Sequence, residues 1–137
     1  MQALIDSIAA KLLDSTVSND VGGRIYYDTA DTNDLPYIVY SIVSAVPDRT
    51  FSERYTELII QFDLFSALSA GKTEITTMYT DLISLMDECS LTITGYTLVW
   101  CRETGLQTFV EDLSALQDGT NLQLHWAIDF ECRISKV

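Results

Sequence analysis

The chain has 137 residues, of which 47% are hydrophobic and 20% charged, so it has the length of one globular domain (1–137) and not the composition of a disordered segment. Twenty acidic against eight basic residues give a formal net charge of −12, which argues against binding a nucleic-acid backbone or an anionic membrane surface. The N-terminus lacks a signal-peptide pattern, and the apolar runs are too short to span a bilayer, so we expect a protein made and kept in a cytoplasm until it is incorporated elsewhere. Cys89, Cys101 and Cys132 lack metal-site spacing and are expected to be free, buried thiols.

The first part of the chain predicts a helix followed by a short strand. Apolar residues recur at helical spacing from Leu4 to Leu13, and the polar stretch Ser15–Asp20 is expected to end this helix. Gly22-Gly23 then forms a turn into a strand over Arg24–Tyr27. An acidic, polar loop follows over Asp28–Asp34.

Two long strands and an arm come next. Tyr37–Val46 is rich in β-branched and aromatic residues, and Thr56–Ser66 alternates between apolar and polar side chains. The stretch Pro47–Tyr55 between them is too long for a tight hairpin turn and carries charges of both signs. We therefore expect a projecting β-hairpin arm.

The second half predicts one helix and further strands. A broad apolar stripe indicates a helix over Ala70–Glu88, and Gly95 marks the turn after it. A strand over Tyr96–Glu103 is expected to be broken by Gly105 from a second run over Gln107–Glu111, and Leu113–Asn121 to form a loop with turn chemistry at Asp118-Gly119. Trp100 and Trp126 are expected in the core.

The last strand, Leu122–Ile134, has the clearest pattern, with apolar residues at every second position and His125, Asp129, Glu131 and Arg133 on the opposite face. Strands connected as hairpins, with few helices between them, favour the α+β class. We predict a mainly antiparallel sheet with two helices packed on one face and a projecting β-hairpin arm.

The motifs that suggest chemistry are weak. Gly71-Lys72-Thr73 lies where a phosphate-binding loop would be, but Ser66 occupies the position of its first glycine and the β-α alternation of such enzymes is missing. Asp28, Asp31 and Asp34 lack the alternating ligands, mid-loop glycine and closing glutamate of a calcium loop. We expect no enzymatic activity, no cofactor and no metal.

His125 is the single histidine of the chain, on the same strand face as Asp129 and Glu131. Residues four apart on a strand lie about 13 Å apart, and no motif places a nucleophile nearby. We expect a surface or interface residue. A catalytic or ligand-binding role for His125 remains the alternative, in a small cytosolic enzyme or ligand-binding domain.

The arm carries the candidate interface residues. Phe51 lies between Arg49 and Arg54, where the domain core cannot easily reach it, and an aromatic residue flanked by arginine is typical of an interface anchor. The alternative is that Phe51 folds back onto its own sheet. Asp28 and Asp31 are candidate partners for the two arginines.

Three stretches carry a family resemblance: Gly22-Gly23-Arg24-Ile25-Tyr26, Leu35-Pro36-Tyr37-Ile38-Val39 and Pro47-Asp48-Arg49. Together with the order of the elements, they resemble the tail-completion, or tail-terminator, proteins of long-tailed bacteriophages and prophages. The similarity covers essentially the whole chain and is weakest over 92–116.

The resemblance implies a non-catalytic α+β protomer that forms a homo-oligomeric, usually six-fold ring. Such a ring ends tail-tube polymerisation and joins the tail to the head-side connector, so its partners are the tail tube protein and the connector protein. DNA passes through the lumen without specific binding, and the protein is found in the virion tail or neck after assembly in the host cytoplasm. A head-side connector or a tube subunit is the alternative within the same class.

Overall fold

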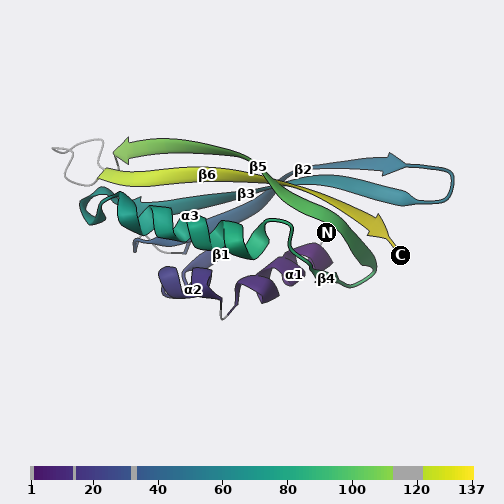
Figure 1. The fold of residues 1–137 in the computed structure, drawn as a ribbon, viewed down its shortest axis with the longest axis horizontal. Helices are drawn as coiled ribbons and strands as arrows, with labels where there is room; N and C mark the ends of the chain where they lie inside the picture. Colours follow the sequence, from purple (N-terminus) through teal and green to yellow (C-terminus); the bar gives the residue numbers. More distant parts are fainter. Residues whose placement is uncertain (1, 14, 32–33, 113–121) are drawn as a thin grey trace.

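The computed structural model describes residues 2–13, 15–31, 34–112 and 122–137, and the loop expected over 113–121 lies outside them (Figure 1). The elements, in chain order, are α1 (Gln2–Leu12), α2 (Thr16–Asp20), β1 (Ile25–Tyr27), β2 (Tyr37–Arg49), β3 (Arg54–Ala67), the 3-10 turn η1 (Leu68–Ala70), α3 (Lys72–Met86), β4 (Thr92–Ile93), β5 (Tyr96–Asp112) and β6 (Leu122–Lys136). None of the described helices is long and apolar enough to cross a lipid bilayer.

One six-stranded sheet in the order β1-β2-β3-β6-β5-β4 organises the fold. β1 pairs parallel to β2, and the other neighbouring strands pair antiparallel. The α+β class and the mainly antiparallel sheet are therefore confirmed.

The helices lie on one face of the sheet, and none of the described helices covers the other face, which we call the helix-free face (Figure 1). The core between them is built from the apolar stripe of α3 and from alternate residues of β3 and β6. Its fully buried members include Ile75, Met78, Leu82, Phe62, Phe130, Ile60 and Ile128. The predicted stripe of the second helix and the alternation of the last strand are both confirmed.

The described residues form three α-helices where two were predicted, since the polar stretch Ser15–Asp20 does not simply end the first helix. Ser15 caps a new helix, α2, by accepting a hydrogen bond from the Ser18 N–H at 3.1 Å. Val17 and Val21 lie four positions apart and are both buried, which anchors α2 to the core.

The predicted break at Gly105 is also wrong, because β5 is one strand from Tyr96 to Asp112. It has register shifts between Leu98 and Trp100 and between Glu103 and Gly105. Each bulge adds one residue and reverses which side chains face the core. Trp100 is consequently half-exposed beside Arg102 instead of in the core, whereas Trp126 packs against the core and against Tyr79.

Candidate functional site

The arm is a regular β-hairpin that projects beyond the rest of the sheet (Figure 1). β2 and β3 stay paired as far as Arg49 opposite Arg54, and residues 50–53 close the turn. The Thr50 N–H donates to the Glu53 carbonyl at 2.9 Å, and the Glu53 N–H donates to Thr50 Oγ1 at 3.1 Å. The tip is thus held by its own hydrogen bonds.

Arg133 on β6 fastens the base of the arm to the sheet. Its guanidinium donates to Asp48 Oδ2 of β2 at 3.0 Å and forms an ion pair with Glu57 of β3. The same guanidinium lies 4.1 Å from the ring centroid of Tyr55. The alternation of β6 indicates only that Arg133 lies on the polar face, because its partners lie on two other strands.

The arm tip presents Phe51, Arg49 and Arg54 to solvent. Phe51 has 113% of its reference exposure, so it does not fold back onto its own sheet. Within the described part of the chain, neither arginine forms an ion pair. An exposed aromatic side chain with two free cations beside it is the composition of an interface anchor.

Asp28 and Asp31 are exposed, and they lie far from the arm of the same protomer. The Asp28 N–H donates to the Tyr40 carbonyl at 3.0 Å, which fixes the start of the acidic loop beside β2, at the β1 edge of the sheet. The length of β2 from Tyr40 to Arg49 corresponds to about 30 Å at the usual rise of a strand. A contact between these aspartates and the arm therefore requires two copies of the chain.

His125 lies on the helix-free face between two carboxylates. Its Nε2 is 2.8 Å from Asp63 Oδ1 on β3, and its Nδ1 is 3.0 Å from Glu111 Oε2 on β5. The imidazole also stacks on Phe65, with 4.4 Å between ring centroids. Asp129, on the same strand face, does not pair with His125 and accepts a hydrogen bond from Gln61 at 3.2 Å.

The two carboxylates favour the imidazolium form. Burial lowers the pKa of His125, but the hydrogen bonds and negative charges of Asp63 and Glu111 outweigh it and leave the pKa raised. Burial raises the pKa of Glu111, and its hydrogen bonds from His125 and Gln123 outweigh that effect and leave it lowered. With both ring nitrogens occupied, His125 has no free lone pair for a general base or a metal ion.

Aromatic rings continue from His125 across the helix-free face. Phe65 stacks on Tyr37 at 4.6 Å, and Tyr37 meets Tyr26 edge-on at 6.5 Å. Phe109 of β5 lies 5.4 Å from His125 on the other side. The row connects β1, β2, β3, β6 and β5, so His125 belongs to a cross-strand structural network.

The other chemical motifs bring no site together. Ser66, at the position where a phosphate-binding loop needs a glycine, is buried and donates to Glu74 Oε1 at 2.5 Å. Among the described residues, no group of three or more His, Cys, Asp or Glu is placed to hold a metal ion.

The comparisons with known proteins concern the fold. No family model matches the chain, and no curated protein matches it. A chain from the virion of a native gene transfer agent (GTA) particle has the same fold, with a TM-score of 0.75 and 10% identity over 95% of this chain and 92% of that chain. A second solved chain, whose name describes no function, has a TM-score of 0.58 and 10% identity over 96% and 94%.

Proposed function

We propose that this protein is a non-enzymatic structural component of a tailed phage or phage-like particle. Its single-domain protomers form a six-fold ring on the head-proximal end of the tail tube. The ring ends tube polymerisation and joins the tail to the head-side connector. The protein would reside in the virion neck after assembly in the host cytoplasm.

The observation that carries the proposal is the fold match to a virion chain over almost the full length of both chains. The order of elements that resembles tail-terminator proteins is present, including the projecting arm between two long strands. The occupied nitrogens of His125 weigh against the enzyme alternative, since this histidine was its main candidate residue.

Two physical features suit a ring. The arm tip and the acidic loop occupy different parts of one protomer, as a head-to-tail interface requires. A charge of −12 on each copy makes free protomers repel, which favours assembly on an existing tube end over assembly in solution. The same acidic surface would let DNA pass through the lumen without binding it.

The fold match alone also suits another neck or tail ring protein, and deletion of the gene separates the alternatives. Without a terminator, tail tubes grow beyond their normal length and remain unjoined to heads. Without a tube subunit no tubes form, and without a head-side connector tubes of normal length accumulate. Electron micrographs of the deletion lysate that show tubes of normal length, or none, would refute the terminator role.

The arm is tested by the double variant Arg49→Glu, Phe51→Ala. These side chains are exposed and make no contact with the core, so we expect the protomer to fold and the ring or the head–tail joint to fail. Loss of the folded protomer in this variant would show that the arm is a structural element instead.

A further inference from the structure

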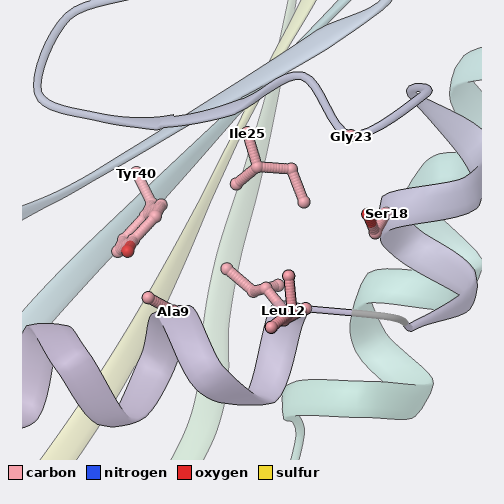
Figure 2. Close-up of a pocket in the computed structure, with 7 residues that line it drawn as sticks. Ala9, Leu12, Ser18, Gly23, Ile25 and Tyr40 are labelled. Atoms are coloured by element: carbon pink, nitrogen blue, oxygen red, sulfur yellow. The ribbon is translucent and has the colours of Figure 1, made fainter.

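A pocket opens between the first helices and the edge of the sheet, far from the arm. Its wall is formed by Ala9 and Leu12 of α1, Ser18 of α2, Ile25 of β1 and Tyr40 of β2, around an open space (Figure 2). Leu13 also lines the pocket, and its side chain is 70% exposed. The side chains of Ala9, Leu12, Leu13 and Ile25 make part of the wall apolar, so an apolar group that displaces poorly ordered water there gains affinity.

The size of the pocket suits one aromatic ring. Its volume is about 220 Å³, below the roughly 300–1,000 Å³ of most small-molecule sites. A dry apolar cavity of about 150 Å³ already accommodates benzene. A single phenyl ring is therefore a better match than a cofactor.

Charges of both signs flank the pocket, with Asp28 beside Tyr40 and Arg24 between the lining residues Gly23 and Ile25. Asp28 is hydrogen-bonded through its N–H to the carbonyl of the pocket residue Tyr40, and both Asp28 and Asp31 are exposed. The neighbouring cation, Arg24, donates from Nε to the Pro36 carbonyl at 3.0 Å. An aromatic side chain that arrives with positive charge beside it matches both the pocket and its rim.

The arm tip has this composition, since Phe51 is fully exposed between Arg49 and Arg54. We propose that Phe51 of one copy inserts into the pocket formed by α1, α2, β1 and β2 of the next copy, with Arg49 and Arg54 meeting Asp28 and Asp31. This inference rests on the proposed ring and specifies its subunit contact. The length of β2 between Tyr40 and the arm prevents the same insertion within one protomer.

A second pocket of about 310 Å³, lined by Thr108, Val110, Leu124 and Trp126 among others, is one competing receptor. Lys72 also lines it and would repel the two arginines of the arm. Lys72 lines the second pocket itself, whereas Arg24 only adjoins the first and is engaged by the Pro36 carbonyl, so of these two pockets charge complementarity favours the one beside Asp28. Contact between two different patches of one chain is head-to-tail, which closes into a ring when the rotation between copies allows it.

The test uses two variants that each damage one side of the contact. Phe51→Ala removes the inserted ring, and Ala9→Phe fills the pocket from an exposed position of α1. Ala10→Phe is the matched control, because Ala10 is exposed on the same helix but does not line the pocket. We expect each of the first two variants to weaken the contact by about 10- to 100-fold, whereas Ala10→Phe assembles like the wild type.

A mixture of Phe51→Ala and Ala9→Phe tests whether the arm of one copy inserts into the pocket of the next. Phe51→Ala keeps an intact pocket and Ala9→Phe keeps an intact arm, so sedimentation of the mixture should show a two-subunit species that neither variant forms alone. That species would also prove that both variants fold. Wild-type rings in either single variant would overturn the insertion and leave the ring function standing, whereas a wild-type protein that never associates, alone or on tail tubes, would overturn both.

Discussion

The Nε2 atom of His125 lies 2.8 Å from Asp63 Oδ1, although 62 positions separate the two residues in the chain. The register of β3 against β6 brings them together, because Phe65 is opposite His125 and Asp63 is opposite Ala127. With Glu111 from β5 on its other nitrogen, the imidazolium links three strands. Its side chain is only 18% exposed, so these interactions are partly shielded from solvent.

His125→Ala should destabilise the protomer by about 2 kcal/mol near pH 6, because it removes two charge-assisted hydrogen bonds and one ring stack. The raised pKa of His125 means that this stability is fully present below its ordinary value of 6.5 and is lost as the pH rises through the raised value. The lowered pKa of Glu111 adds stability that is present above its ordinary value of 4.5 and is lost as the pH falls through the lowered value. Urea melts of both proteins should thus differ most between about pH 5 and 6.5; a difference that grows towards pH 9 would contradict the assignment.

Arg133→Ala should loosen the arm. The substitution removes the contacts with Asp48, Glu57 and Tyr55 and should cost roughly 1–2 kcal/mol of stability. Trypsin should then cleave after Arg49 and Arg54 several-fold faster than in the wild type. Arg102→Ala is the control, since the Arg102 guanidinium lies over Trp100 and pairs with Glu88, neither of which belongs to the arm. Equal cleavage rates in both variants would show that Arg133 does not fasten the arm.

Asp20→Asn should stabilise the protein at pH 8 and have little effect near pH 4. Burial, together with the hydrogen bond and negative charge of Asp81, raises the pKa of Asp20 from 3.8 to about 7. Because the folded state holds the proton more tightly, this group lowers stability as the pH rises between about 4 and about 7. Asp20 is half-buried and solvent screens part of this effect, so the gain should stay below about 1 kcal/mol. Thermal melts with Asp6→Asn as control provide the measurement, and a stabilisation that is equal at both pH values would rule out this cause.

Reversing charges across the proposed contact should abolish and then restore assembly. Arg49→Asp places a carboxylate against the acidic loop and should disrupt the ring, whereas adding Asp31→Arg should recover part of it. Asp31 is preferred to Asp28 for this purpose, since Asp28 has φ +66°, which suits Asp or Asn better than a long side chain. Sedimentation of the single and double variants measures the effect, and a double variant no better than Arg49→Asp would argue against this pairing.

Local periodicity explains what the sequence predicted well. The stripe of α3 and the alternation of β6 are repeated over many residues, so each indicates its buried face without knowledge of its neighbours. β5 lacks this property, because its two bulges interrupt the alternation. The side chains that face the core have even numbers at Leu98, odd numbers at Cys101 and even numbers again at Leu106. The same sequence therefore suggested two strands with a break at Gly105.

Only those parts of the candidate site that lie within one continuous stretch of sequence could be predicted. The arm follows from one continuous stretch, and the exposure of Phe51 between two arginines could be anticipated from its neighbours. The partners of His125 and Arg133 depend on the strand order β2-β3-β6-β5, which brings together residues from distant parts of the chain. The pocket beside Tyr40 likewise needs α1, α2, β1 and β2 to be placed together before it exists.

The central claim is that this protein forms a ring that closes a tail tube. The most direct test measures the mass of the purified protein, alone and mixed with tail tubes from the same particle, and then images the mixture by negative-stain electron microscopy. We expect a ring, or a cap at one end of each tube, with the tubes no longer able to grow there. A protein that stays monomeric and leaves both tube ends bare would contradict it.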